Sequence, residues 1–240
     1  MAHYFFSDVH LGYGERPADK VREKRLLQFL SSIQPSAESL FIVGDLFDYW
    51  FEYKTVIPKY HVRTLAKIAE FVDRGCAVHY CIGNHDFGHA NYFHDEIGVI
   101  MHEDDFPITL DGKKFYISHG DGKAANDLGY RILKKILRSK LNLKIFTFLH
   151  PTIGIGVAAW SSRQSREYTG QKDYGPKDGM IEFAKQKIHE GYDYVVMGHR
   201  HKPLEITEGN GTYVNLGDWI HHCSYAVCEK GVLTLRKFEK

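Results

Sequence analysis

The sequence predicts an α/β protein in which two sheets pack together and helices cover them. Short runs rich in valine, isoleucine, tyrosine and phenylalanine alternate with stretches whose apolar residues recur at helical spacing. This alternation is typical of a sheet with helices on its faces. After residue 202 the pattern changes to short strands separated by glycine and asparagine turns, which predicts a second, antiparallel sheet.

Each element is predicted from its own local pattern. Two helices are expected because residues 20–33 and 60–72 each keep one apolar face. Five short buried strands, each followed by a polar cluster, are expected at residues 3–7, 39–43, 77–82, 114–118 and 192–197. Four further strands, which would form the second sheet, are expected at residues 204–207, 212–216, 224–228 and 232–237. The 240 residues suit a single domain, 1–240, that carries an insertion.

The bulk composition excludes several classes of protein. Hydrophobic residues make up 43% of the chain and charged residues 25%, as in ordinary globular domains. The four cysteines form no C-x-x-C pair, no secretory signal is recognisable, and no apolar run reaches the roughly 18 residues of a membrane span. We therefore expect a cytoplasmic protein with reduced thiols. The 15 histidines are unusual, because histidine is the commonest metal ligand.

Potential metal ligands follow the strands that the sequence predicts. Seven such side chains stand at strand ends: Asp8, His10, Asp45, Asn84, His119, His199 and His201. Ligands in α/β proteins bind beyond the carboxyl ends of the strands, so we expect these side chains to converge. Carboxylate, imidazole and amide ligands suit divalent ions such as Mn²⁺, Fe²⁺, Zn²⁺ or Co²⁺. Seven ligands are too many for one such ion and suit two ions that share a carboxylate, which can act together on a phosphate.

The strand ends resemble the calcineurin-like metallophosphoesterase superfamily. Its motifs are matched in order by Asp8-x-His10, Gly44-Asp45-x-x-Asp48, Gly83-Asn84-His85-Asp86, His119-Gly120-Asp121 and Gly198-His199-x-His201. The resemblance implies a four-layer α/β/β/α sandwich of two mixed sheets. It implies one ion held by Asp8, His10, Asp45 and His201, and a second held by Asp45, Asn84, His119 and His199, with Asp45 bridging.

The same resemblance assigns roles to three further residues. His85, with Asn84 beside it, matches the catalytic position near the scissile phosphate, where it would donate a hydrogen bond or protonate the leaving group. The alternative for His85 is a purely structural histidine. Asp48 and Asp86 are expected to orient the ligands.

The stretch from residue 128 to residue 166 contains eight lysines and arginines and no acidic residue. It is also apolar, and its first helix would place leucine and isoleucine opposite its basic residues. Lying within a helical insertion at about residues 123–190, between two ligand-bearing strands, it would overhang the metal site as a lid. Such a helix is typical of a surface that meets anionic lipid. The alternative is an ordinary helix packed on the core with a solvated basic face.

A narrower resemblance is to the UDP-2,3-diacylglucosamine pyrophosphatases of lipid A assembly. It is carried by Gly44-Asp45-Leu46-Phe47, by Asp127-x-Gly129-Tyr130 after the His119 motif, and by Gly198-His199-x-His201-x-Pro203. It implies hydrolysis of the diphosphate to UMP and 2,3-diacylglucosamine 1-phosphate (lipid X), usually with Mn²⁺. The basic and apolar pattern of residues 128–166 predicts peripheral contact with the cytoplasmic face of the inner membrane. Substrate contacts would come from His85, Asp127, Tyr130, Ser162, Arg163 and Arg166. One departure is His85, because the best-known members carry arginine there.

Two other functions are alternatives to this one. A general metallophosphoesterase acting on nucleotides, phosphoproteins or small phosphodiesters would share the metals and differ in the lid. A non-catalytic scaffold of the same fold would be expected to lose ligands, and here all seven are present. The net charge of +1 and the apolar character of the basic stretch argue against a nucleic-acid partner, and no obligate protein partner is indicated.

Overall fold

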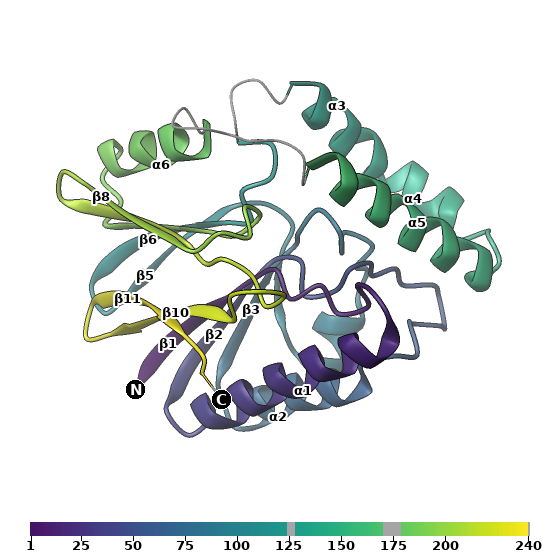
Figure 1. The fold of residues 1–240 in the computed structure, drawn as a ribbon, viewed down its shortest axis with the longest axis horizontal. Helices are drawn as coiled ribbons and strands as arrows, with labels where there is room; N and C mark the ends of the chain where they lie inside the picture. The colour runs from purple at the N-terminus through teal and green to yellow at the C-terminus, as the bar shows by residue number, and fades with distance from the viewer. Residues whose placement is uncertain (124–127, 170–178, 240) are drawn as a thin grey trace.

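The computed structural model describes residues 1–123, 128–169 and 179–239, which form two mixed sheets with helices on both sides (Figure 1). The first sheet has the order β11 (Val232–Lys237), β10 (Ser224–Glu229), β1 (Ala2–Phe6), β2 (Ala37–Val43), β3 (Ala77–Cys81) and β4 (Ile100–His102). The second has the order β5 (Phe106–Leu110), β6 (Lys113–Ser118), β7 (Tyr194–Met197), β9 (Gly211–Asn215) and β8 (Leu204–Glu208). The prediction of an α/β fold with two packed sheets is confirmed.

Strand β1 shows how the sequence builds the layers. Successive side chains of a strand point to opposite faces of the sheet. Tyr4 and Phe6 therefore pack toward the helices, whereas Phe5 lies between the sheets, where its ring stacks on Phe41 at 4.6 Å and on Phe115 at 5.7 Å between centroids. Every residue of this strand is buried, which explains its continuous apolar character.

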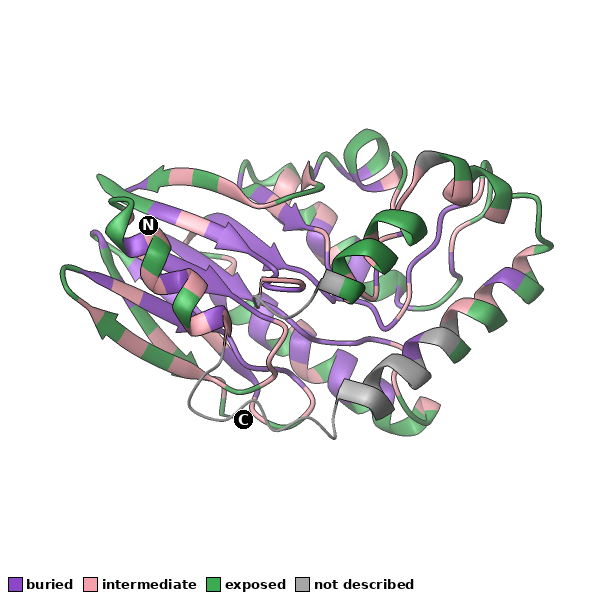
Figure 2. Ribbon diagram, turned by 90° about the horizontal axis from the view of Figure 1, so that it is seen from above, coloured by how far each residue is buried: buried purple, intermediate pink, exposed green. Residues whose placement is uncertain are grey.

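Helices close the two outer faces. The apolar stripes of α1 (Arg16–Ile33) and α2 (Val62–Asp73) pack on the first sheet, and α6 (Gly179–His189) packs on the second. In Figure 1 these helices lie below the first sheet and above the second. The strands between them are largely buried in Figure 2. A π-helical turn, η1 (Phe93–Ile97), leads into β4.

The predicted pairing of the strands was wrong in two respects. The four C-terminal strands exist, but only β8 and β9 belong to the second sheet, while β10 and β11 join the first sheet through antiparallel pairing of β10 with β1. Strands β6 and β7 lie in the second sheet with β5. Periodicity identifies a strand but not its partner. Strands β4 and β5 were missed, because β4 has three residues and β5 contains a proline.

Three helices stand between β6 and α6 in the chain: α3 (Leu128–Leu137), α4 (Lys140–Phe146) and α5 (Pro151–Thr169). They lie together at one end of the sandwich, apart from α6, although α6 follows them in the chain (Figure 1). We call these three helices, with the turns that join them, the cap. Many large apolar side chains of the cap are exposed: Ile132, Leu133, Ile136, Leu137, Leu141, Ile145, Phe148, Leu149, Ile153, Val157 and Trp160. No helix in the described part of the chain is long and apolar enough to span a bilayer.

Because of two neighbouring histidines at the junction of the sheets, the folded protein is expected to lose stability in acid. His79 Nδ1 lies 3.0 Å from His102 Nε2, and the His102 ring stacks on Phe106. Burial lowers the pKa of His79, and burial together with His79 lowers the pKa of His102 from 6.5 to about 4. Between pH 6.5 and about pH 4 the unfolded chain therefore binds more protons at His102 than the folded protein does. The stability contributed by neutral His102 is present above pH 6.5 and is lost as the pH falls toward 4.

We expect the free energy of unfolding to fall between pH 7 and pH 5 in the native protein. In His102→Gln this fall should be smaller by on the order of 1 kcal/mol, because the glutamine side chain does not titrate. Urea unfolding followed by circular dichroism at both pH values measures this difference. Equal pH dependence in the two proteins would show that the histidine pair does not contribute.

Candidate metal centre

The seven predicted ligands come together at one edge of the two sheets. Strands β1, β2 and β3 are parallel to one another, and so are β6, β7 and β9, so the loops after their carboxyl ends meet. The loops carry the following residues: Asp8 and His10 after β1, Asp45 after β2, Asn84 after β3, His119 after β6, and His199 and His201 after β7.

A first group of ligand atoms gathers around the Asp8 carboxylate. Asp8 Oδ1 lies 3.3 Å from His201 Nε2 and 3.8 Å from His10 Nε2, and the two Nε2 atoms are 3.1 Å apart. Asp45 Oδ2 lies 3.8 Å from His10 Nε2. All of these groups are buried except His201, which is partly exposed. Asp8, His10 and His201 can thus present one nitrogen or oxygen each to a single cation.

A second group adjoins the first through Asp45. Asn84 Oδ1 lies 2.9 Å from both His119 Nε2 and His199 Nδ1. Asp45 Oδ2 lies 3.2 Å from His119 Nε2. The same carboxylate oxygen of Asp45 therefore faces both groups, which is the position of a shared ligand.

The donor atoms fit a pair of divalent ions. Asp8 Oδ1 and Asp45 Oδ2 are buried and have no hydrogen-bond partner within the described ranges, although a buried carboxylate oxygen is costly to leave unpaired. Both oxygens point at imidazole nitrogens at separations that a common cation would bridge. Oxygen and imidazole nitrogen together suit Mn²⁺, Fe²⁺, Zn²⁺ or Co²⁺.

Glycines allow the loops to approach each other this closely. A Cβ atom added at Gly83 would lie 2.1 Å from Asp45 Oδ1, and one added at Gly198 would lie 2.4 Å from Asp8 Oδ2. Neither distance is possible for a real side chain, so both positions require glycine. The two carboxylates thus rest directly on the backbone of neighbouring loops.

The backbone of the ligand loops is itself unusual. Five ligand residues have positive φ angles: Asp8 (53°), His10 (49°), Asp45 (53°), His199 (69°) and His201 (56°). This left-handed region disfavours residues with a Cβ atom, and such outliers cluster at functional sites.

Three imidazoles are oriented by a group on their far side. His10 Nδ1 lies 3.4 Å from Asp48 Oδ1, His201 Nδ1 lies 3.6 Å from Asp218 Oδ2, and His119 Nδ1 lies 2.9 Å from the Val43 carbonyl oxygen. Each contact leaves Nε2 directed at the ligand group, an arrangement that fixes the tautomer of metal-binding histidines.

Asp218 was not among the sequence candidates. It follows Gly217 at the end of β9, in the same pattern as Gly44-Asp45 after β2. That repeated pattern was the available signal. Its Oδ1 also accepts hydrogen bonds from the backbone N–H groups of His221 and His222, and these bonds, together with His201, lower the pKa of Asp218 to about 2 although burial alone would raise it.

Asp86 holds the loop that carries Asn84. Its Oδ1 accepts a hydrogen bond from the Gly83 N–H at 2.9 Å, and its Oδ2 accepts one from the Tyr80 hydroxyl. Asp86 is fully buried, so water does not compete for these hydrogen bonds, and they fix the start of the loop.

The carboxylates and imidazoles of the centre shift one another's pKa values. Burial alone would raise the pKa of Asp45 and of Asp8, but neighbouring imidazoles, His119 and His201 respectively, lower both below the usual range. Burial alone would lower the pKa of His119 and of His201, but the same carboxylates raise each to about 10. Burial and the charge of His119 lower the pKa of His199 to about 3. A cation would compete with these protons, so binding should weaken at low pH.

His85 lies at the face of this centre. Its backbone N–H donates to Asp45 Oδ1 at 2.8 Å, and its ring packs edge-to-face on His10 at 4.9 Å between centroids. Its Nδ1 lies 2.6 Å from the hydroxyl of Ser162 on α5. The structure therefore brings His85 and Ser162 together, as expected if both contact one substrate, and places a cap residue directly over the metal centre.

The other predicted substrate contacts are placed less fully. The Tyr130 hydroxyl donates to Asp121 Oδ2 at 2.9 Å, two residues after His119. Asp127 lies outside the described residues, and so do the side chains of Arg163 and Arg166.

The basic face of α3 turns toward the protein. Lys134 Nζ lies 2.7 Å from Asp121 Oδ2, and the Arg138 guanidinium donates to the Gly83 carbonyl oxygen at 2.6 Å. The apolar face of the same helix, including Ile132 and Ile136, is exposed. The alternative of an ordinary helix packed on the core by its apolar face does not hold, although Arg131 and Lys135 on the basic face are exposed, as that alternative predicts. A cavity of about 600 Å³ lies beside this helix. Its lining includes Lys134, Arg138, Phe87 and His89.

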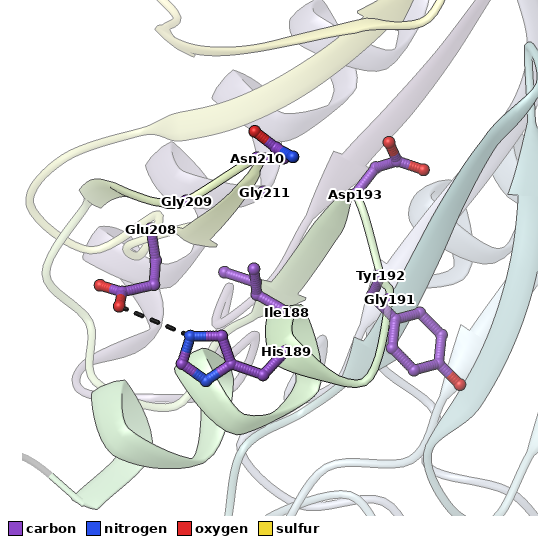
Figure 3. Close-up of a pocket in the computed structure, with 9 residues that line it drawn as sticks. All are labelled: Ile188, His189, Gly191, Tyr192, Asp193, Glu208, Gly209, Asn210 and Gly211. Carbon is purple, nitrogen blue, oxygen red and sulfur yellow. Dashed lines mark ion pairs between the residues drawn. The ribbon is translucent and has the colours of Figure 1, made fainter.

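A second cavity, of about 360 Å³, lies at the opposite end of β7 (Figure 3). Gly191 to Asp193, which precede β7, line it together with the turn between β8 and β9. His189 and Glu208 form an ion pair at 3.8 Å across it, and the His189 side chain is 70% exposed. None of the seven ligands lines this cavity, so it is separate from the metal centre.

Fold and site together define a phosphoesterase with two adjoining metal positions. The chain belongs to the calcineurin-like phosphoesterase family, whose profile matches residues 1–203. It is similar to the UDP-2,3-diacylglucosamine hydrolase of Porphyromonas gingivalis, with 32% identity over 255 residues that cover 98% of this chain and 97% of that protein.

Similar proteins with the same name come from other bacteria. The protein of Haemophilus ducreyi is 28% identical over 222 residues, covering 91% of this chain and 92% of its own length. That of Neisseria meningitidis serogroup B is 30% identical over 225 residues, covering 93% and 91%.

Proposed function

We propose that this chain hydrolyses the diphosphate bond of UDP-2,3-diacylglucosamine and releases UMP and 2,3-diacylglucosamine 1-phosphate. Three observations support this: the family, the full-length similarity to hydrolases named for this substrate, and the converging ligand atoms beside a cap with exposed apolar side chains. The observation that carries the proposal is the shared Asp45 oxygen between two ligand groups, because it supplies the chemistry that any such hydrolysis needs.

The ligand roles follow the two groups. Asp8, His10 and His201 would hold one ion, Asn84, His119 and His199 the other, and Asp45 both. Mn²⁺ is the first choice, with Fe²⁺, Zn²⁺ and Co²⁺ as alternatives. When bound, such ions activate water and stabilise negative charge on phosphate oxygens.

His85 is the proposed catalytic side chain, next to Asn84. Ser162 holds the Nδ1 side of its ring, so a hydrogen bond or proton given to the phosphate would come from Nε2. The backbone N–H of His85 donates to Asp45, which fixes the main chain of His85 relative to the metal centre, and the ring itself contacts Ser162 and His10. Asp127, Tyr130, Ser162, Arg163 and Arg166 are the remaining proposed substrate contacts.

The substrate itself can be tested by product analysis. Purified protein with Mn²⁺ should release UMP from UDP-2,3-diacylglucosamine, and kcat/KM for UDP-N-acetylglucosamine should be lower by at least about 10²-fold, because acyl binding energy is lost. Chromatography of the nucleotide products measures both rates. Equal rates on the two substrates would favour a general metallophosphoesterase, and no turnover of either would refute the proposed substrate.

The cap is the proposed site of contact with the cytoplasmic face of the inner membrane. Phe148, in the turn between α4 and α5, is 82% exposed, Trp160 on α5 is 64% exposed, and lysines and arginines lie on the three helices of the cap. Replacing either aromatic by serine should weaken binding to vesicles that contain anionic lipid by about tenfold, since the apolar contact is lost. Sedimentation with vesicles measures this, with Val232→Ser on β11 as a control of similar exposure. Unchanged binding in both aromatic variants would place the membrane contact elsewhere.

A further inference from the structure

Arg138 stands where the cap meets the metal centre. It follows the last residue of α3 and is followed by the residue that caps α4. Its side chain is 18% exposed, so the charge is largely removed from water and requires partners.

Within the described residues, the groups that contact the Arg138 side chain belong to loops of the metal centre. Its guanidinium donates to the Gly83 carbonyl oxygen at 2.6 Å and lies 3.7 Å from Asp121 Oδ2. Its Cζ lies 5.8 Å from the centroid of the Phe87 ring. Gly83 precedes Asn84 and Asp121 follows His119 by two residues, so one side chain contacts two of the loops that carry the second ligand group.

The hydrogen bond to Gly83 completes the fixation of that residue. The Gly83 N–H donates to Asp86, and its carbonyl oxygen accepts from Arg138, so side chains bind both of its backbone polar groups. The Cα of Gly83 packs against Asp45 with no room for a Cβ atom. Asp86 therefore holds the peptide before Gly83 from the core, and Arg138 holds the peptide between Gly83 and Asn84 from the cap.

We propose that Arg138 is a positioning residue: by holding the Gly83 carbonyl it orients Asn84 for metal binding and makes a complete metal centre depend on the seated cap. The inference rests on the proposed metal centre but not on the identity of the substrate. One terminal nitrogen of the guanidinium, Nη2, makes both contacts, so a single largely buried charge links the carbonyl of one ligand loop to the carboxylate of another.

The test compares Arg138→Met with Lys144→Met, which removes an exposed cation from α4 of the same cap. Calorimetric titration of the metal-free proteins with Mn²⁺ should show one of two binding events weakened by about 10- to 100-fold in Arg138→Met, the usual effect of losing a group that orients a ligand. The Mn²⁺ concentration for half-maximal hydrolysis of bis(p-nitrophenyl) phosphate, a small diester, should rise by the same factor. Lys144→Met should match the native protein in both measurements.

Mn²⁺ affinity in Arg138→Met within about threefold of the native value would overturn the inference, since orienting groups contribute more than this. An equal loss in Lys144→Met would also overturn it, because any cap charge would then suffice. If Arg138→Met does not fold by circular dichroism, Arg138→Gln, which is uncharged and too short to reach both acceptors, is measured by the same criteria. Failure to cleave UDP-2,3-diacylglucosamine would leave this result standing and refute only the substrate.

Discussion

Replacing Asp45 by alanine should reduce turnover by about 10³-fold or more and lower the number of bound Mn²⁺ ions, because one carboxylate oxygen serves both ligand groups. Asp45 Oδ2 lies 3.2 Å from His119 Nε2 and 3.8 Å from His10 Nε2, so its removal affects both metal positions at once. Calorimetric titration with Mn²⁺ gives the stoichiometry, and UMP release gives the rate.

The control for this experiment is Asp73→Ala, which removes an exposed carboxylate at the end of α2. It should bind two Mn²⁺ ions and turn over at the native rate. A normal rate in Asp45→Ala with two ions bound would rule out the bridging role of Asp45.

Replacing His85 by alanine should leave metal binding intact and reduce kcat by about 10²- to 10⁴-fold, the usual contribution of a positioned acid or hydrogen-bond donor. Metal binding should survive because residue 85 contacts Asp45 through its backbone N–H, which alanine retains. Metal content and kcat are measured on the same preparation.

His94→Ala, which removes a histidine whose side chain is 72% exposed, serves as the matched control. A near-native kcat in His85→Ala would return His85 to a structural role. Loss of Mn²⁺ from that variant would instead point to the ring as a ligand, since His85, His10 and Asp45 also present atoms close enough to share an ion.

The convergence of the seven candidate ligands was predictable because they follow the ends of five strands. Asp45 and Asn84 each follow a glycine that follows a buried strand, and parallel strands place such ends at one edge. Asp218 follows Gly217 in the same way, but a single Gly-Asp pair after an unplaced strand is weak evidence on its own. Its proximity to His201 depends on β9 pairing with β7, which no local pattern reveals.

The orientation of the cap was not predictable from its amphipathic pattern. The spacing of α3 defines an apolar and a basic face, and burial of the apolar face is the usual outcome. Here Asp121 and the Gly83 carbonyl oxygen supply partners for Lys134 and Arg138, so the basic face turns inward. Only the tertiary position of those two acceptors decides between the faces, and Gly83 comes from a loop distant in sequence.

The left-handed backbone at Asp8, His10, Asp45, His199 and His201 sets a limit on how far this protein can be stabilised without harm. Each such residue costs roughly 1 kcal/mol relative to glycine, so the five together cost on the order of 5 kcal/mol, comparable to the whole net stability of many domains. A selection for heat resistance alone would find its easiest gains at these positions. Each gain would remove a ligand, so thermal resistance and catalysis would be selected in opposite directions in the same five residues.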